Sequence, residues 1–349
     1  MVRLFRGSSP RPIIEYLTID NEEGMNWVKI GDVPTSGRII TSTEEKITKK
    51  GAKKSRHVYV GDLILSNSMS YGLPYIMGIE GCIHDGWFVL RDYEQNFNKD
   101  YLCNLLISDI VQKQYKKLAA GGVVQNISSD LVNSVFISIP SLDEQRKIAG
   151  LLSLIDERIA TQNKIIDKLE SLIKGVTQRI VYGNKHNTQI ANCLKCSSSS
   201  LQENEVKETG IYPVYGANGI VGYLDSYSTK HEAIYIIKDG SGVGSVSYVT
   251  GECSATGTLN ILEANKDFSL LYLYYILKIF NFNPYRTGMA IPHIYFKDYS
   301  KAKIFCPPYD KQVKYAKLLS AIEKKLITEQ KILDLISLQK QYLLRQMFI

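Results

Sequence analysis

Two stretches of this chain repeat nearly the same long amphipathic segment, and they constrain the fold more than any other feature. The first runs PSLDEQRKIAGLLSLIDERIATQNKIIDKL from Pro140, and the second runs PPYDKQVKYAKLLSAIEKKLITEQKILDLI from Pro307, 167 positions later. The two copies align without a gap over 41 positions. Each begins with proline followed by acidic residues, which is typical of the first turn of a helix. The sequence therefore predicts two related long helices.

Apolar residues recur in both copies at alternating intervals of three and four, the heptad spacing of a coiled-coil seam. The predicted seam residues are Ile148, Leu152, Ile155, Ile159, Ile166 and Leu169 in the first copy and Leu319, Ile322, Leu326, Leu333 and Ile336 in the second. Gln162 and Glu329 interrupt the seam at one matching position, where polar residues can fix register. Because a single helix of about 60 Å would expose this seam, we expect the copies to pack as an antiparallel pair. A coiled coil that only dimerises the protein is the alternative.

The segments that precede the two helices also resemble each other, although more faintly. Residues 62–90 and 232–262 both show strand patterns separated by a Ser/Gly-rich loop and a Gly-containing turn. A short helix is expected after each, around residues 99–118 and 268–280. The chain is too long for one ordinary core, so we predict an α+β fold of two similar mixed α/β domains joined by two long antiparallel coiled-coil helices, a pseudo-two-fold internal repeat. The predicted boundaries are 1–140, 141–183, 184–306 and 307–349.

Composition and charge exclude several classes of protein. No stretch approaches the roughly 20 apolar residues of a membrane span, and no apolar run follows the first basic residues, so a cytoplasmic protein is expected. The net charge of +7 is spread along the chain rather than gathered in a tail, so any nucleic acid would be bound by placed residues. Only Cys193 and Cys196 have CxxC spacing, and nothing completes a tetrahedral metal site; reduced thiols and no metal are expected.

Motifs for catalysis are missing from the sequence. There is no G-x-x-x-x-G-K-[ST] loop for ATP and no Asn-Pro-Pro-aromatic or Asp-Pro-Pro-aromatic motif of an amino-methyltransferase. GSGVG at residues 240–244 lacks the GxGxxG spacing, and a strand rather than a helix is expected to follow it. His84 beside Asp85 could act as a general base, although a polar pair in a turn is the simpler interpretation. The sequence predicts a chain that is not an enzyme and holds no cofactor.

Three segments of the sequence resemble segments of a known protein family. Residues 139–152 fit the pattern I-P-x-x-[DE]-E-Q-x-x-I-A-x-x-L, which resembles the helix of specificity subunits of type I restriction-modification systems. YPVYGANGIVGYLD at 212–225 and GIEGCIHDGWFVL at 78–90 are similar to parts of that family's target recognition domains. The resemblance covers the entire chain, in the order recognition domain, spacer helix, recognition domain, spacer helix.

The resemblance implies a non-catalytic reader of duplex DNA. Each recognition domain would bind one half of a bipartite target, asymmetric because the two domains differ in sequence. The paired helices would set the gap between the halves and dock two copies of an adenine-N6 methyltransferase subunit. S-adenosylmethionine would belong to that partner, and a restriction or translocase subunit with its ATP can join the complex. Two alternatives stay open: a coiled-coil assembly protein whose two domains bind ligands other than DNA, and the reader of a fused restriction-methylation enzyme of another type.

A dense group of basic residues is the first candidate for DNA contact. Lys46 and the five residues Lys49, Lys50, Lys53, Lys54 and Arg56 lie within eleven positions. Such residues suit phosphate contacts, which position a protein without reading sequence. A solvated loop is the equally plain interpretation.

Candidate base readers are amides, hydroxyls, aromatic rings and cations in the predicted loops, since these groups can contact base edges. In the first domain they are Ser66, Asn67, Ser68, Tyr71, His84, Trp87, Gln125 and Asn126. In the second domain they are Tyr215, Asn218, Lys238, Ser241, Tyr248, Arg286 and His293. Trp87 could instead be a core residue.

Overall fold

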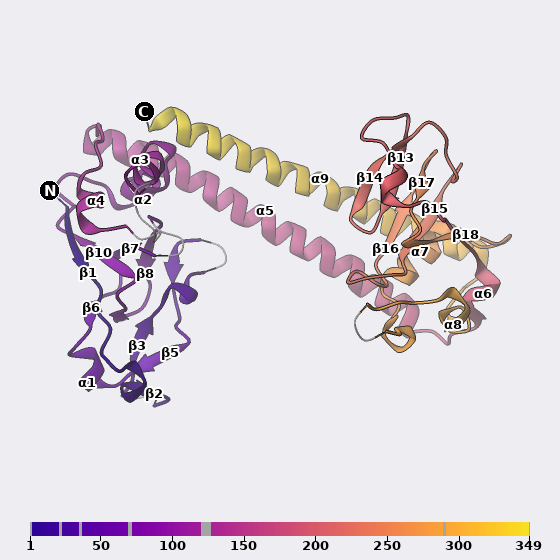
Figure 1. The fold of residues 1–349 in the computed structure, drawn as a ribbon, viewed down its shortest axis with the longest axis horizontal. Helices are drawn as coiled ribbons and strands as arrows, with labels where there is room; N and C mark the ends of the chain where they lie inside the picture. Colours follow the sequence, from indigo (N-terminus) through magenta and orange to yellow (C-terminus); the bar gives the residue numbers. More distant parts are fainter. Residues whose placement is uncertain are drawn as a thin grey trace. The chain divides into compact units, whose positions relative to one another are not determined.

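The structure is a computed structural model that describes residues 2–20, 23–34, 37–68, 72–119, 127–288 and 291–348 (Figure 1). The chain divides into two compact units. Unit 1 comprises Met1–Thr161 and Leu333–Ile349, and unit 2 comprises Gln162–Ile332. Each unit therefore contains one globular segment together with parts of both long helices.

In the described residues of unit 1, two five-stranded sheets form the globular part. The first has the order β1-β10-β7-β8-β4, with strands Arg3–Arg6 (β1), Trp87–Arg91 (β10), Leu63–Ser66 (β7), Pro74–Met77 (β8) and Ile39–Ile40 (β4). The second has the order β2-β5-β3-β9-β6, with strands Leu17–Thr18 (β2), Glu45–Ile47 (β5), Met25–Val28 (β3), Gly81–Ile83 (β9) and Arg56–Val58 (β6). Alternate residues of β7 enter different cores: Leu63 and Leu65 pack toward the helices, and Ile64 packs on the opposite face. Both faces of this strand are covered, which explains why its first three residues are all apolar.

Short helices accompany the sheets of unit 1. They are α1 (Lys49–Ala52), α2 (Lys99–Ile107), α3 (Asp109–Ala119) and α4 (Ser129–Asn133), with 3₁₀ turns at Ile13–Glu15 and Ile30–Asp32. Asn98 caps α2, because its side chain accepts a hydrogen bond from the Tyr101 backbone N–H at 3.0 Å. The expected helix around 99–118 is confirmed as the consecutive helices α2 and α3.

Unit 2 contains three sheets in its described residues. A four-stranded sheet has the order β12-β18-β15-β16, with strands Leu194–Ser198 (β12), Leu259–Ala264 (β18), Ala233–Ile237 (β15) and Val246–Val249 (β16). The smaller sheets are β14-β13-β17, with strands Gly219–Leu224 (β14), Tyr212–Gly216 (β13) and Ser254–Ala255 (β17), and the pair Thr188–Gln189 (β11) with Lys303–Ile304 (β19). The helices of its globular part are α6 (Ile190–Cys193), α7 (Leu270–Lys278) and α8 (Phe296–Tyr299), with 3₁₀ turns at Glu203–Glu205 and Asn283–Tyr285. Helix α7, expected around 268–280, is buried along nearly its whole length.

The two units repeat the same strand topology, as the sequence predicted from residues 62–90 and 232–262. In unit 1, β10 pairs antiparallel with both β1 and β7, and β9 pairs parallel with β3. In unit 2, β18 pairs antiparallel with both β12 and β15, and β17 pairs parallel with β13. The succession β7, β8, β9, β10 therefore corresponds to β15, β16, β17, β18. The predicted α+β fold with two similar mixed domains and two long helices is confirmed.

The long helices span Leu142–Tyr182 (α5) and Tyr309–Met347 (α9). Every predicted seam residue is buried or half-buried. In unit 1, Ile148 and Leu152 of α5 share a core with Leu343 and Met347 of α9. In unit 2, residues near the end of α5, such as Ile180, share a core with the start of α9. Within each unit the two helix segments therefore run antiparallel, as predicted. None of the helices in the described ranges is long and apolar enough to cross a membrane.

A buried glutamine joins each long helix to its own domain. The Gln145 Oε1 accepts from the backbone N–H of Asn98, the cap of α2, at 2.8 Å, and its Nε2 donates to the carbonyls of Pro140 and Asn96 at 3.0 and 2.9 Å. In unit 2 the Gln312 Oε1 accepts from the backbone N–H of Ser269, the cap of α7, at 2.9 Å. Its Nε2 donates to the carbonyl of Pro307 at 2.8 Å. The repeated glutamine thus satisfies matching backbone groups in both units.

The two polar seam residues contact each other within unit 2. The Gln162 Nε2 donates to the Glu329 backbone carbonyl at 3.0 Å and to the Glu329 carboxylate, which Lys325 also contacts. These hydrogen bonds from Lys325 and Gln162 lower the pKa of Glu329. In unit 1 a further polar residue of α9, Lys340, contacts Asp156 of α5. Each of these polar side chains therefore contacts a partner on a neighbouring turn or on the facing helix.

Candidate nucleic-acid interface

The turn between β9 and β10 gathers polar side chains from several segments of unit 1. The Asp85 carboxylate accepts from the Ser9 hydroxyl at 2.7 Å and from Arg11 Nη2 at 3.4 Å. Its backbone carbonyl accepts from Asn67 Nδ2 at 2.9 Å and from Arg6 Nε at 3.3 Å. Two exposed arginines and a loop after β7 therefore converge on one turn.

Electrostatics at this turn favour an ionised aspartate beside a neutral histidine. The Ser9 hydroxyl, helped by Arg11, lowers the pKa of Asp85. Burial lowers the pKa of His84, although the neighbouring Asp85 opposes this effect. The His84 ring lies within reach of the backbone N–H groups of Gly86, at 2.6 Å from Nδ1, and of Ile30, at 3.2 Å from Nε2. Neutral imidazole has a single acceptor nitrogen, so it accepts one of these hydrogen bonds at a time. The polar-pair interpretation of His84 and Asp85 matches this arrangement.

Three predicted base readers of unit 1 are buried, and this corrects their assignment. Ser66 is 1% exposed and its hydroxyl accepts from the backbone N–H of Leu73 at 3.1 Å. Asn67 is 3% exposed, and its amide holds the Asp85 carbonyl. Trp87 is fully buried, with its ring edge-on to Tyr75 at 5.7 Å, so the core interpretation holds. These side chains are covered by the surrounding chain and cannot touch a base edge in this conformation.

The other predicted readers of unit 1 fall into two groups. Ser68 and His84 are half-buried next to the turn and have the access to solvent that a reader needs. Tyr71, Gln125 and Asn126 lie outside the described residues. Ile127, which follows them directly, donates its backbone N–H to the Asn67 carbonyl at 2.9 Å. The chain at Ile127 therefore lies against the loop after β7.

The basic group of unit 1 surrounds helix α1, which Thr48 caps by accepting from Gly51 N–H at 3.2 Å. Its predicted phosphate contacts, Lys49, Lys50, Lys53, Lys54 and Arg56, are all exposed. Lys49 pairs with Glu23 at 3.1 Å, and Lys54 donates to the Tyr16 hydroxyl at 2.6 Å. Arg56 lies over the Phe5 ring at 5.4 Å. Ion pairs between exposed groups are weak, so these cations can turn to another anion at little cost.

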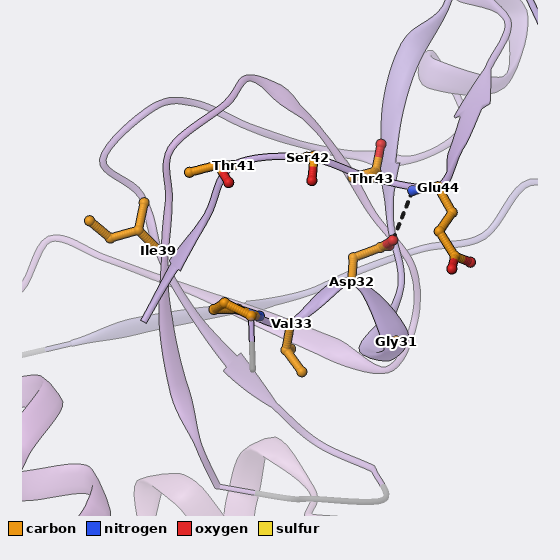
Figure 2. A pocket seen from close by; sticks show the side chains of 9 residues that line it. Gly31, Asp32, Val33, Ile39, Thr41, Ser42, Thr43 and Glu44 are labelled. Atoms are coloured by element: carbon orange, nitrogen blue, oxygen red, sulfur yellow. Dashed lines mark hydrogen bonds between the residues drawn. The ribbon is translucent and has the colours of Figure 1, made fainter. Parts of the chain in front are cut away.

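A hollow of about 290 Å³ in unit 1 does not have the features of a ligand site (Figure 2). It is lined by residues 31–34, 39 and 41–44, among them the carboxylates of Asp32 and Glu44. Both Asp32 oxygens accept backbone hydrogen bonds, from Glu44 N at 2.9 Å and from Lys29 N at 2.6 Å. Its carboxylate therefore closes the loop on itself.

In unit 2 the loop after β15 and the segment before α8 form a second polar cluster. The Ile294 N–H donates to the Lys238 carbonyl at 2.9 Å, and the Gly240 N–H donates to the Pro292 carbonyl at 3.0 Å. The Lys238 N–H donates to the Thr258 carbonyl at 3.0 Å, as the Asn67 N–H of unit 1 donates to Gly86. Lys238 and Asn67 therefore occupy matching positions, as do Ile294 and Ile127.

Side-chain contacts complete this second cluster. The His293 Nδ1 lies 2.7 Å from Asp239 Oδ1, and the exposed Arg286 donates from Nη2 to the Val243 carbonyl at 2.7 Å. Ser241 is exposed on the same loop, where Gly240 and Gly244 have positive φ values of 97° and 91°. Strand β16 follows, so the sequence prediction that no helix follows GSGVG is confirmed. We call these five residues, Lys238, Asp239, Ser241, Arg286 and His293, the unit 2 cluster.

The remaining predicted readers of unit 2 belong to other elements. Tyr215 lies in β13, edge-on to Tyr235 at 5.9 Å. Asn218 lies at the turn between β13 and β14. Tyr248 donates its hydroxyl to Glu232 and packs on Tyr274 at 5.4 Å, so it is tied to its surroundings.

Sequence reasoning missed the residues that organise both clusters. Arg6, Ser9 and Arg11 of unit 1 approach Asp85, although they lie more than 70 positions away in the chain. In unit 2 the missed residue is Asp239. The only signal in the sequence was adjacency, since Asp85 follows His84 and Asp239 follows Lys238.

The CxxC pair does not converge on a shared site. Cys193 Sγ lies 3.6 Å from Cys306 Sγ in the core, whereas Cys196 lies in β12 and is half-buried. All six cysteines are unpaired in the structure. Within the described ranges, no group of histidine, cysteine and acidic residues could hold a metal ion.

Comparisons with known proteins agree with this architecture. The chain is 20% identical over 328 residues to the type I restriction enzyme EcoprrI specificity subunit of Escherichia coli, covering 85% of this chain and 80% of that protein. A putative type I restriction enzyme specificity subunit of Haemophilus influenzae is 24% identical over 137 residues, which is 38% of this chain and 35% of that protein.

Solved structures show the same fold. The type I restriction-modification S subunit from M. genitalium superposes with a TM-score of 0.63 at 18% identity, covering all of this chain and 94% of that one. A chain from a study of complex assembly and conformational transition of the type I R-M system gives a TM-score of 0.61 at 16% identity, covering 98% and 96%. The sequence profile described as "Type I restriction modification DNA specificity domain" matches twice, over residues 9–171 and 184–338. With two matches that together span most of its length, the chain belongs to the family of type I restriction-modification DNA specificity domains.

Proposed function

We propose that this chain is the DNA-reading subunit of a type I restriction-modification complex and carries no catalytic group of its own. Unit 1 reads one half of a bipartite target and unit 2 reads the other. The target is asymmetric because the loops that correspond in the two units carry different side chains. Two adenine-N6 methyltransferase subunits dock on the chain, and a restriction subunit joins them for cleavage.

The observation that carries this proposal is that each unit gathers polar side chains at the same repeated loop. The loop after β7 in unit 1 and the loop after β15 in unit 2 correspond to each other. Around the first loop unit 1 presents His84, Asp85 and Arg11, and at the second loop unit 2 presents Lys238, Asp239 and His293. Cations, amides and imidazoles are the groups that read base edges in the major groove. Backbone hydrogen bonds on both sides of each loop hold these groups in place, which is the preorganisation a reader needs.

The exposed lysines around α1 fit the positioning part of this function. Phosphate contacts fix orientation and supply much of the affinity, which then falls steeply with salt. Lys50 and Lys53 are cations near the paired Lys49 and Lys54. They contact phosphates flanking the first half-site in the proposed complex.

The outer faces of the long helices support docking of partner subunits. Besides charged side chains they expose apolar ones: Leu151 and Leu154 of α5 in unit 1 are 42% and 64% exposed. In unit 2 Leu318 and Ile327 of α9 are 50% and 46% exposed. Apolar groups repeated along a helix and left in water are typical of a surface that a partner covers. The partner supplies S-adenosylmethionine and the methyl-transfer chemistry, and the restriction subunit supplies ATP hydrolysis.

The test is a genome-wide map of N6-methyladenine in cells that carry the methyltransferase partner with and without this chain. A bipartite motif that disappears with the chain is the expected result. If the methylation map is the same in both strains, the chain does not specify the target. In that case, salt-independent binding to a protein or glycan would favour an assembly protein instead.

The gap between the half-sites tests the role of the helices. Inserting one heptad into α5 and one into α9 at matching positions keeps the seam in phase. We expect the two half-site sequences to stay the same and the number of unread base pairs between them to change. Altered half-sites with an unchanged gap would contradict this role.

A further inference from the structure

The unit 2 cluster contains one histidine, His293. Hydrogen bonds hold its backbone and its ring nitrogen Nδ1. The His293 backbone is held on both sides, because its N–H and carbonyl both bond to Thr287 at 2.7 and 2.9 Å while the flanking Pro292 and Ile294 bond to the loop after β15. A turn at Gly288 makes this possible: its φ is +86°, and a Cβ there would come within 2.3 Å of the Ile291 carbonyl oxygen. Backbone hydrogen bonds therefore hold the chain at His293 and at both of its neighbours.

Asp239 determines the hydrogen on this imidazole. A carboxylate only accepts hydrogen bonds, so the 2.7 Å contact to Asp239 Oδ1 requires the hydrogen to reside on His293 Nδ1. In the neutral ring Nε2 is then an acceptor, because the bond made by one ring nitrogen fixes the role of the other. His293 is about one-third exposed at its side chain, and among the described residues no hydrogen bond reaches Nε2.

Two cations lie on the segments next to His293. Arg286 is exposed and fixed to the Val243 carbonyl, and the Lys297 ammonium lies over the exposed Tyr295 ring at 5.4 Å. The imidazole of His293 lies nearly parallel to the Tyr295 ring, with 6.5 Å between centroids. These cations would attract a nucleic-acid backbone to the part of unit 2 that carries His293.

We propose, on the basis of the function proposed above, that His293 reads one base of the second half-site and that Asp239 is its positioning residue. The Nε2 acceptor selects a base that presents an exocyclic amino hydrogen in the major groove, which is N4 of cytosine or N6 of adenine. Thymine and guanine present only acceptors at the corresponding positions and leave Nε2 unpaired. One base pair of the second half-site is therefore restricted to cytosine or adenine on the contacted strand.

The experiment uses the full chain expressed with its methyltransferase partner, and methylated motifs are mapped for each variant. His293→Asn keeps a donor for Asp239 but does not reach the Nε2 position, whereas His293→Gln places an amide oxygen there. We expect H293N to relax one base pair of one half-site, with discrimination there falling about tenfold or more, and H293Q to retain it. H231N is the matched control, since His231 is an exposed histidine of the same unit outside the cluster.

Variants of Asp239 separate positioning from stability. Asp239→Asn still offers an oxygen to Nδ1–H and should preserve discrimination, while Asp239→Ala should lose it at the same base pair as H293N. Thermal melting of each variant shows whether the fold is retained. An unchanged motif in H293N, or a uniform loss of methylation without relaxation at one base pair, would overturn the proposal. If the wild-type chain produces no motif at all, the proposed function itself fails, so the two failures are distinguishable.

Discussion

The joints between helix and domain are alike in the two units, whereas the loop clusters differ. Gln145 and Gln312 both bond to the N–H of a helix cap and to the carbonyl of the proline before their own helix. In the loops, unit 1 surrounds an aspartate with two arginines and a serine, while unit 2 pairs an aspartate with a histidine. A buried joint must satisfy fixed backbone groups and allows few solutions. An exposed loop on a rigid frame is free to carry different readers.

Removing the glutamine that joins a long helix to its domain should have the largest effect on stability. Replacing Gln145 with Leu leaves the Asn98 N–H and the carbonyls of Asn96 and Pro140 without their partner. Each unsatisfied buried group costs about 1–3 kcal/mol, so we expect the free energy of unfolding to fall by roughly 4 kcal/mol. Gln312→Leu removes one bond fewer and should cost roughly 3 kcal/mol. Urea denaturation measures both, and Gln178→Leu at an exposed position of α5 is the control. If only one of the two variants lost stability, the two glutamines would not play equivalent roles.

The polar seam contact of unit 2 should have a smaller effect that depends on its partner. Gln162→Leu leaves Glu329 with Lys325 alone and should destabilise the helix pairing. Gln162→Leu combined with Glu329→Leu makes the seam apolar and should restore or exceed the wild-type stability. A double-mutant cycle followed by thermal unfolding measures this coupling. Additive losses in the double variant would show that the two side chains stabilise the helices independently.

Acid should weaken unit 2 through Glu329 and unit 1 through Asp85. Both carboxyl groups have a lowered pKa in the folded chain, so the unfolded chain binds more protons as the pH falls. Their stabilisation is complete above the ordinary carboxyl range of about 4 and disappears as the pH drops through the lowered values. Glu329→Gln and Asp85→Asn should each flatten part of the acid limb in a plot of melting temperature against pH. Parallel curves for variant and wild type would contradict this assignment.

The basic residues around α1 should have the smallest individual effects. Replacing Lys50 or Lys53 with Gln should weaken DNA binding similarly for all sequences. Each substitution should reduce the slope of log K against log salt by about 1. Titration of target and unrelated duplexes at several salt concentrations measures this, with the partner methyltransferase present. A change in the methylated motif would instead make these lysines readers of sequence.

Some of the predicted base readers lie together in the fold, and others are buried. Lys238, Ser241, Arg286 and His293 were chosen for their chemistry in predicted loops, and the fold brings them to one cluster. Ser66 and Trp87 were chosen on the same grounds and are buried, because the strands β7 and β10 are covered on both faces. Asp239 and Arg11 were not chosen at all, since what they contact lies 54 and 74 positions away.

The sequence by itself determined the two long helices, their seam and the repeat of the domains. Helix periodicity and heptad spacing are local properties, and the gapless likeness of two segments needs no knowledge of contacts. Only the tertiary structure decided that Gln162 meets Glu329, that Gln145 and Gln312 bond to the caps of neighbouring helices, and which loop residues face solvent. Those outcomes depend on which backbone groups lack partners and which faces are covered, and both are set by packing between segments far apart in the chain.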